Sequence, residues 1–399
     1  MKRRRFYRPG GGTASVALLS LLLLAADKPV APADYAADAR SLAGIVNANY
    51  AYLERLPGRR FSLSPKLTAE AEQVADGRSL VRFSERALAL LADHHAITGN
   101  SRSDSWALFP SYGDLWIERR DAQFMITAVR DASPSASAGV RPGDHLLAID
   151  GQPTAAAVAA FWDDLGVAGG GERDAYAARV LAAGQRNRPR KLTIGNLLSR
   201  PRELELPNLY VLAPVDRPVL KLSEVGQETV IKFNDSLGSD ATIAAFDLAM
   251  TKVRLHRRLI LDLTDTPGGG NTSVARAILG WFVARPAYYQ VHNFPAEERR
   301  TGIARQWVEQ VLPRPGKYWG GPVTVRVGRW TGSMGEGLAV GFHTIGKRVE
   351  GDRMAGLLGA IYDYRFDKSG QLIKFPSERL SAVDGTPRER FVPARPGKR

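Results

Sequence analysis

Hydrophobic residues recur every three or four positions over residues 34–96, which is the spacing of one face of an α-helix. The pattern forms two apolar stripes, and the helix-breaking pair Pro57-Gly58 lies between them. The stripes consist of Leu42, Ile45, Val46 and Leu53, and of Leu67, Ala71 and Val74. We therefore predict an N-terminal helical region, which we assign to residues 27–100.

A different pattern, with short strands and turns, begins near Tyr112. The predicted strands are residues 124–129, 146–149 and 191–194. An Ala- and Gly-rich stretch, residues 167–184, interrupts the strands as an insertion. These features predict a β domain over residues 101–209.

Strands and helices alternate from about residue 210 onward. The predicted strands are residues 229–233, 259–263 and 322–327, and the predicted helices are residues 240–253 and 274–282 with a further helix that includes residues 338–345. This alternation is typical of an α/β domain whose active loops lie at strand ends. We assign the α/β domain to residues 210–399.

Composition excludes several classes of function. The chain has 399 residues, enough for two or three domains with a sizeable core. It has no cysteine, which excludes disulfides, thiol catalysis and cysteine metal sites. The formal net charge is +14, from 55 Lys and Arg against 41 Asp and Glu. The basic residues are interspersed with acids and form no basic helix or aromatic–basic strand, so we expect no nucleic-acid partner.

The start of the chain has the pattern of a targeting signal. Basic residues at positions 2–8 lead into an uncharged apolar run at residues 14–26. This run of 13 residues is shorter than the span of about 20 that crosses a membrane, and it suits a secretory signal. We therefore interpret residues 1–26 as a signal peptide or an uncleaved membrane anchor. The body of the protein is then exported, to a periplasmic or extracellular location.

Ser333 is the candidate nucleophile. It lies between the predicted strand at residues 322–327 and the helix that follows. At such a junction, free backbone N–H groups and the positive end of a helix stabilise developing negative charge. The structural alternative is that Ser333 only caps the helix, because serine is favoured at that position.

Three glycines follow the predicted strand at residues 259–263, at Gly268, Gly269 and Gly270. Glycine lets a reacting carbonyl approach backbone N–H donors closely, although a tight turn would also use these residues. A phosphate loop does not fit, because no Lys-Ser/Thr pair follows the glycines. We predict an oxyanion hole that combines the N–H of Met334 with that of Gly268 or Gly269.

A serine nucleophile needs a base, which is most often histidine. The histidines of the chain are His94, His95, His145, His256, His292 and His343. His343 lies almost three helical turns beyond Ser333, and His292 lies in a connecting segment. His94 and His95 follow a predicted helix, where a side chain can project into a cleft. They are adjacent rather than at ligand spacing on a helix face, so we expect no metal and no cofactor.

The β domain resembles a bacterial PDZ domain. The resemblance rests on Ala138-Gly139-Val140, Gly143-Asp144, Ile149 and Gly151. PDZ domains add an extended peptide to a strand edge and hold its C-terminal carboxylate on backbone N–H groups. The resemblance implies that the loop with Tyr112, Gly113 and Leu115 binds the peptide. Asp114 lies within this loop, where its charge would oppose a carboxylate.

The chain as a whole resembles the C-terminal-processing, or tail-specific, serine peptidase family. Beside the PDZ-like unit, the resemblance rests on residues 45–50, on Asp262-Leu263 with the glycines that follow, and on Thr331-Gly332-Ser333-Met334-Gly335-Glu336. It implies an α/β fold with a crotonase/ClpP-like catalytic core of β-β-α units. It also implies Ser333 as the nucleophile, and Gly268 or Gly269 with Met334 as the oxyanion donors.

The family has a Ser–Lys dyad group and a tricorn-like group that uses Ser, His and Glu. Where the dyad group has its lysine, this chain has Leu357, which cannot accept a proton. The tricorn-like group has an Asp-x-His sequence, which Asp93-His94-His95 matches, so the resemblance implies His95 as the base. His94 replaces the relay serine of tricorn. A Gly-x-x-x-Glu segment matches residues 385–389 and implies Glu389 as the third member, although its flanking arginines also suit a surface ion pair.

Two functions are compatible with these features. The first is an exported serine endopeptidase that cleaves proteins or peptides near their C-termini by acyl-enzyme chemistry. The second is a non-catalytic peptide- or ligand-binding protein on the same fold. The departures at Leu357 and His94, and Thr264 in place of the usual arginine of an Asp-Leu-Arg motif, are consistent with lost activity.

Overall fold

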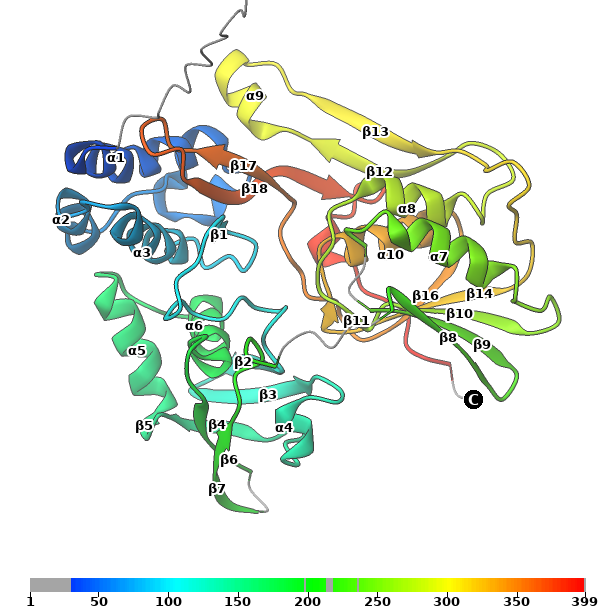
Figure 1. Ribbon diagram of the computed structural model, residues 1–399, viewed down its shortest axis with the longest axis horizontal. Coiled ribbons are helices and arrows are strands. Elements are labelled where there is room, and N and C mark those ends of the chain that lie inside the picture. The colour runs from blue at the N-terminus through cyan, green and yellow to red at the C-terminus, as the bar shows by residue number, and fades with distance from the viewer. Residues whose placement is uncertain (1–29, 197–198, 213–217, 235–236, 398–399) are drawn as a thin grey trace, which may run out of the picture.

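The computed structural model describes residues 30–196, 199–212, 218–234 and 237–397 (Figure 1). Residues 1–26, interpreted as a signal peptide or anchor, lie outside the described residues. Within those ranges, no helix has both the length and the apolar character needed to cross a membrane.

Helices make up the first part of the described chain. They are α1 (Pro32–Asn49), α2 (Pro65–Glu72) and α3 (Gly77–Ala89), with the short 3-10 turns η1 (Leu53–Arg55) and η2 (Pro57–Arg59) between α1 and α2. Asp76 caps α3 by accepting a hydrogen bond from the N–H of Ser79 at 2.6 Å. Leu42, Val46 and Leu67 of the two apolar stripes are fully buried. The stripes therefore mark the faces on which these helices pack.

The next part is an antiparallel sheet in the order β2-β3-β4-β6-β7. Its strands are β2 (Leu115–Arg120), β3 (Gln123–Val129), β4 (His145–Ile149), β6 (Arg190–Asn196) and β7 (Ser199–Leu206), and the short β5 (Gln152–Pro153) pairs with β4. Its helices are α4 (Pro134–Ser137), α5 (Thr154–Asp164) and α6 (Glu172–Ala183). The strands predicted at residues 124–129, 146–149 and 191–194 are confirmed. The insertion predicted at residues 167–184 contains a helix, α6, which packs against the edge strand β2.

A second sheet, in the order β8-β9-β10-β14-β16, forms the α/β part. Its strands are β8 (Leu220–Val225), β9 (Glu228–Phe233), β10 (Arg258–Asp262), β14 (Val323–Val327) and β16 (Arg348–Gly351), parallel except for β8. Helices α7 (Ala241–Met250), α8 (Thr272–Leu279) and α10 (Met334–Thr344) cover one face of this sheet (Figure 1). Parallel strands need crossover connections, which these helices supply. The predicted alternation of strands and helices is confirmed.

A third sheet joins the N-terminal helices to the α/β part. It contains β1 (Ile97–Thr98), β12 (Ala287–Asn293), β13 (Gln306–Val311), β17 (Ala360–Arg365) and β18 (Leu372–Ser381), with α9 (Pro295–Thr301) between β12 and β13. Ile97 pairs with Lys374, and Val291 pairs with Ser381, so β18 connects segments far apart in the chain. The sequence pattern did not predict these strands.

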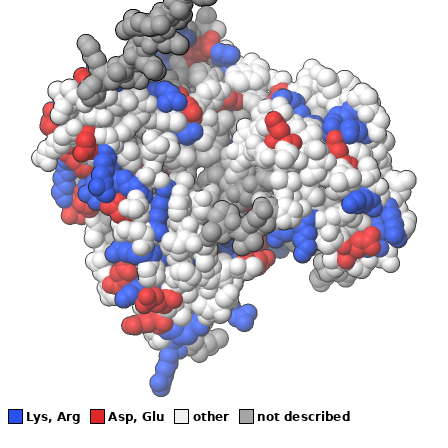
Figure 2. Space-filling model, viewed as in Figure 1, with Lys and Arg blue, Asp and Glu red and all other residues white. Residues whose placement is uncertain are grey.

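Charge is mixed on the surface. On the face shown in Figure 2, Lys and Arg side chains lie among Asp and Glu side chains rather than in one basic patch. This face therefore carries no continuous basic patch.

Candidate active site

Ser333 lies at a strained strand-to-helix junction. The short strands β11 (Asp265–Thr266) and β15 (Trp330–Thr331) pair in parallel, and α10 begins directly after Ser333. Ser333 has φ +51° and ψ −114°, a backbone conformation that a non-glycine residue adopts only when its surroundings impose it. Gly332 is required before it, because an added Cβ would lie 2.6 Å from the carbonyl oxygen of Pro267. The predicted strand-to-helix junction is therefore present, and the tight turn there holds the backbone of Ser333 in an unfavourable conformation.

The glycine loop packs directly against the first turn of α10. A Cβ added at Gly269 would lie 2.8 Å from the Cβ of Met334, and one added at Gly335 would lie 2.9 Å from the carbonyl oxygen of Thr266. Gly269 also has φ +136°, which side-chain-bearing residues rarely adopt. The structure thus places Gly269, one of the predicted oxyanion residues, close to the Cβ of Met334, the residue after Ser333.

Glu336 is a buried carboxylate in the same turn, and we did not single it out from the sequence. Its side chain is fully buried and accepts hydrogen bonds from the N–H groups of Ser333 at 2.9 Å, Gly356 at 2.8 Å and Leu357 at 3.2 Å. Burial raises the pKa of Glu336 to about 7, against the opposing charge of Arg388 and these hydrogen bonds. The Ser-x-x-Glu spacing of a helix capping box was the signal that could have identified it.

His95 is buried on the turn after α3, with 7% of its surface exposed. Its Nδ1–H donates to the carbonyl of Leu358 at 2.7 Å, and its backbone N–H donates to Asp93 at 2.9 Å. In this tautomer Nε2 is the unprotonated nitrogen. Burial lowers the pKa of His95 to about 4, and the charge of Arg388 acts in the same direction, against the hydrogen bond to Leu358. The imidazole is therefore neutral near pH 7, as a general base requires.

Residues 356–359 approach both His95 and the turn at Ser333. His95 donates a hydrogen bond to the carbonyl of Leu358. The preceding residue, Leu357, lies against the turn at Gly332 and Ser333, here called the serine turn: a Cβ added at Gly332 would lie 3.1 Å from Leu357 Cδ1. Among the described residues, no hydrogen bond joins the Ser333 hydroxyl to an imidazole, a carboxylate or a lysine. Nucleophile and predicted base thus approach the same segment, residues 356–359, without direct contact.

Glu389 lies near the base but does not bind it. One of its carboxylate oxygens is buried and has no hydrogen-bond partner among the described residues, and the Nδ1 of His95 is already bound to Leu358. Its charge acts instead on Asp93, whose pKa burial raises to about 6 with a smaller contribution from Glu389. The neighbouring Arg388 turns inward, in the 3-10 turn η3 (Arg388–Arg390), and donates to the carbonyls of Leu357 at 2.9 Å and Gly359 at 2.6 Å. A surface ion pair is therefore not the role of Arg388.

His94 and His292 have structural partners. His94 accepts a hydrogen bond from Arg179 at 2.9 Å and packs between the rings of Phe109 and Tyr176. His292, expected in a connecting segment, is instead on strand β12, where both ring nitrogens bind carboxylates, those of Glu309 and Glu378. Burial opposes protonation of His292, but these bonds raise its pKa to about 9. A charged, doubly bonded imidazole cannot act as a base.

The loop predicted to bind a peptide terminus is joined to the serine turn. The N–H groups of Tyr112 and Gly113 donate within the loop, to Leu108 at 2.7 Å and Pro110 at 3.3 Å. The carbonyl of Gly113 accepts a hydrogen bond from the indole of Trp330 at 2.7 Å. In this conformation those N–H groups are used, so peptide binding by Tyr112, Gly113 and Leu115 stays a prediction.

Asp114 has a structural role within that loop. It forms a buried ion pair with Arg190, with two hydrogen bonds of 2.6 and 3.1 Å, and accepts the N–H of Ser135 at 3.0 Å. Although burial opposes it, the Arg190 guanidinium holds the pKa of Asp114 below its usual range. Arg190 therefore neutralises the negative charge of Asp114, which from the sequence alone argued against a carboxylate-binding site in this loop.

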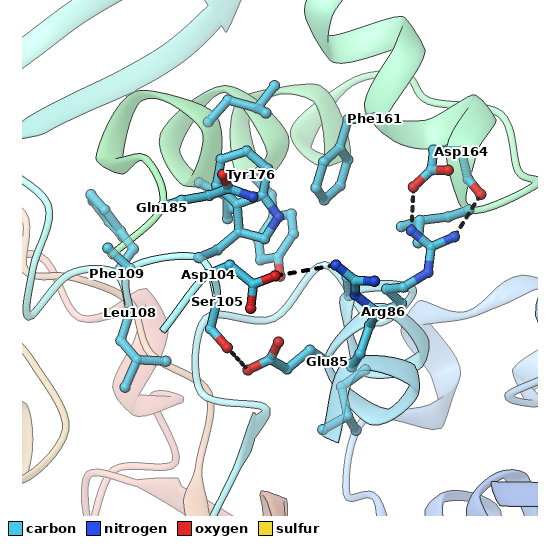
Figure 3. A pocket seen from close by; sticks show the side chains of 18 of the residues that line it. Glu85, Arg86, Asp104, Ser105, Leu108, Phe109, Phe161, Asp164, Tyr176 and Gln185 are labelled. Atoms are coloured by element: carbon cyan, nitrogen blue, oxygen red, sulfur yellow. Dashed lines mark hydrogen bonds and ion pairs between the residues drawn. The ribbon is translucent and has the colours of Figure 1, made fainter. Parts of the chain in front are cut away.

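A cavity of about 650 Å³ lies beside the turn that carries Asp93 and His94. It lies between α3, the segment at residues 97–109, α5 and α6. Asp93 and His94 line it, whereas Ser333 and His95 do not. Figure 3 shows its apolar walls, with Phe161 and Tyr176 on one side and Leu108 and Phe109 on another, and the Glu85–Ser105 and Arg86–Asp164 contacts. The cavity is thus adjacent to the predicted base but separate from the nucleophile. Among the described residues, no cluster of His, Asp and Glu is arranged to hold a metal ion.

Residues 125–159 match the PDZ domain family. No curated protein sequence matches the chain.

Similar solved structures span nearly the whole chain. A photosystem II D1 C-terminal processing protease has a TM-score of 0.53 and 14% identity, covering 90% of this chain and 92% of that one. Mature CPAF has a TM-score of 0.54 and 14% identity, covering 91% and 92%. Mature CPAF complexed with lactacystin has a TM-score of 0.52 and 14% identity, covering 91% and 93%. The chain therefore contains a PDZ domain and shares the overall fold of these proteins, one of which is a C-terminal processing protease.

Proposed function

We propose that this protein is an exported serine endopeptidase that cleaves polypeptides near their C-termini. The observation that carries the proposal is the forced conformation of Ser333 at the start of α10, with Gly269 close to the neighbouring Met334. A reactive alcohol and two candidate oxyanion residues then lie in one turn. The fold similarity to a C-terminal processing protease supports the same reaction class.

The reaction assigns a role to each residue. Ser333 attacks the scissile carbonyl, and the Nε2 of His95 accepts the serine proton and later gives it to the leaving amine. The N–H of Met334, with that of Gly268 or Gly269, stabilises the oxyanion. A water then hydrolyses the acyl-enzyme with His95 again as the base. No hydrogen bond joins His95 to Ser333 among the described residues, so this mechanism requires their contact to form during the reaction.

In this proposal Glu389 acts on the base indirectly, through its charge on Asp93, whose carboxylate accepts the backbone N–H of His95. The Ser/His/Glu assignment is supported by the neutral, buried His95 and by Leu357, which cannot act as a base. The PDZ domain binds protein and peptide substrates or gates their access. The hydrogen bond from Trp330 to the carbonyl of Gly113 connects its loop directly to the serine turn. The signal-like residues 1–26 support export.

The test combines a fluorophosphonate probe with cleavage of an unfolded protein such as reduced, alkylated lysozyme. The wild-type chain should be labelled and should cleave. Ser333→Ala should abolish both activities, and His95→Ala should slow labelling by about 100-fold or more. A Ser333→Ala variant that still cleaves would refute the assignment.

A second function is favoured by one observation, the absence of a Ser333–His95 hydrogen bond. A non-catalytic peptide- or ligand-binding protein needs no such contact. It would bind an unfolded chain without consuming it, and neither the wild type nor any variant would react with the probe.

A further inference from the structure

We propose that Arg388 is a positioning residue that sets the nucleophile and the base relative to each other through residues 356–359, here called the strap. The inference rests on the proposed function. It adds a residue that the resemblance to the peptidase family did not bring in, where Glu389 was the expected member.

The first half of the strap is fixed to the nucleophile. The carboxylate of Glu336 accepts the N–H groups of Gly356 and Leu357, and the same carboxylate accepts the N–H of Ser333. One buried side chain therefore connects the backbone of Ser333 to the strap. Any shift of the strap would be transmitted to the serine turn, because a buried carboxylate cannot exchange these bonds for water.

The second half of the strap is fixed to the base. His95 donates to the carbonyl of Leu358, while Arg388 donates to the carbonyls on either side of it, at Leu357 and Gly359. Three consecutive carbonyls are thus held by two side chains from opposite ends of the chain. Arg388 orients the strap so that the middle carbonyl meets the imidazole, which selects the tautomer with Nε2 unprotonated.

Arg388 is suited to this role because it is buried and charged. It is 3% exposed, and its charge acts on both Glu336 and His95. Both hydrogen bonds to the strap come from one atom, Nη2, while the buried Nε has no hydrogen-bond partner among the described residues. The guanidinium keeps its charge throughout the working pH range, so Arg388 acts on its neighbours through charge as well as through hydrogen bonds. Removing Arg388 would leave two buried carbonyls unpaired. It would also favour protonation of Glu336, which weakens the hydrogen bonds that this carboxylate accepts from the first half of the strap.

Other titratable groups lie near the base, and their effects must be distinguished from that of Arg388. Asp93 lies on the turn of His95, Tyr50, Tyr52 and Arg55 follow the end of α1, and Glu389 lies beside Arg388. None of these donates to the strap among the described residues. Arg390 offers a matched control, since it belongs to the same short turn but is exposed.

The experiment compares Arg388→Gln, Arg388→Lys and Arg390→Gln with the wild type. For Arg388→Gln we expect kcat to fall by about 100-fold with KM nearly unchanged, because misplacing catalytic groups by about 1 Å has this effect. The acid limb of the kcat/KM profile should move to higher pH, since the lost positive charge lets His95 take up a proton more easily. Arg388→Lys should keep the position of that limb and recover part of kcat. Arg390→Gln should behave as the wild type.

A second readout does not depend on turnover. In the intact protein, NMR titration of the His95 ring should show a higher pKa in Arg388→Gln than in the wild type, and an unchanged one in Arg390→Gln. If the wild type neither cleaves nor reacts with a fluorophosphonate, the proposed function fails, and this titration still decides whether Arg388 holds the imidazole.

Two results would overturn the positioning role. One is an Arg388→Gln protein whose kcat equals that of the wild type. The other is a loss of activity that is equal at every pH with an unmoved His95 titration, which is the behaviour of a merely structural residue. Should Arg388→Gln not fold, Arg388→Lys decides: the proposal requires a reduced kcat at unchanged KM, and a wild-type kcat contradicts it.

Discussion

The indole N–H of Trp330 donates to the carbonyl of Gly113 at 2.7 Å, across 217 positions of sequence. Trp330 lies three residues before Ser333, and Gly113 lies in the loop that leads into β2 of the PDZ domain. Around this bond, Phe109, Trp116 and Leu357 form a small buried cluster. The PDZ domain and the serine turn are therefore packed as one continuous body at this point.

The first prediction concerns that bond. Trp330→Phe removes the donor and leaves the Gly113 carbonyl unpaired in a buried site, so we expect a loss of about 1–3 kcal/mol of unfolding free energy. Chemical denaturation monitored by circular dichroism measures the loss. Trp307→Phe is the control, because the Trp307 indole makes no hydrogen bond with a described residue. Equal effects of the two substitutions would mean that the hydrogen bond contributes nothing.

The second prediction isolates the contact at the oxyanion residues. Gly269→Ala and Gly270→Ala change neighbouring glycines with φ of +136° and +133°, so both carry backbone strain of about 1–3 kcal/mol. Only at Gly269 does the new Cβ also meet Met334, at 2.8 Å, whereas nothing lies within 4 Å of a Cβ at Gly270. We expect Gly269→Ala to reduce peptide hydrolysis by about 100-fold or more and Gly270→Ala to reduce it far less. Steady-state kinetics on one peptide would show the difference, and matching losses would place the oxyanion site elsewhere.

The third prediction concerns pH and the stability of the fold. The pKa of His95 is about 4 in the folded protein, against about 6.5 in an unfolded chain, so the unfolded state binds the proton first on acidification. His95 therefore stabilises the fold above about pH 6.5, and its contribution is lost as pH falls toward 4. The loss is on the order of 3 kcal/mol.

Glu336 acts in the opposite direction. Its pKa of about 7 lies above that of an unfolded glutamate, so its contribution is full below about pH 4.5 and is lost as pH rises through 7. The comparison must therefore be made between variants, by urea denaturation from pH 4 to 8. We expect His95→Gln to lose less stability than the wild type between pH 6.5 and 4. Parallel curves for the two proteins would contradict the buried, neutral imidazole.

The fourth prediction concerns the buried pair in the PDZ loop. Arg190→Met leaves the Asp114 carboxylate buried without its cation, which should destabilise the protein by about 3–5 kcal/mol. Adding Asp114→Asn should restore much of the loss, because the remaining amide needs no counter-charge. Thermal unfolding measures both, with the exposed Arg188→Met as the control. Failure of the double variant to recover stability would show that the geometry of the pair, rather than its charge, matters.

Several features of this protein followed from the sequence alone, because their signals are local. The strands β3, β4, β10 and β14 correspond to predicted runs of apolar residues, which must be buried on at least one face wherever they lie. The strand-to-helix junction at Ser333 and the PDZ motif near Ile149 also depend on short spacings. Neighbouring residues determine such features, so they can be predicted without knowledge of the fold.

Other features depended on which distant segments meet. Strands β12, β13, β17 and β18 lie in segments without a clear alternating pattern, and they form because β18 pairs with both β1 and β12. For the same reason His292 became a buried ion-paired residue rather than part of a connection. Pairing partners hundreds of residues apart leave no local periodicity to detect.

The direction of single side chains was decided only by tertiary packing. Arg388 and Glu389 are neighbours with similar surroundings in sequence, yet Arg388 binds the strap and Glu389 does not bind His95. Sequence determined which chemical groups this protein has and which local elements carry them. Tertiary structure decided which of those groups are buried together, because desolvation and hydrogen-bond partners come from segments that meet only in the folded chain.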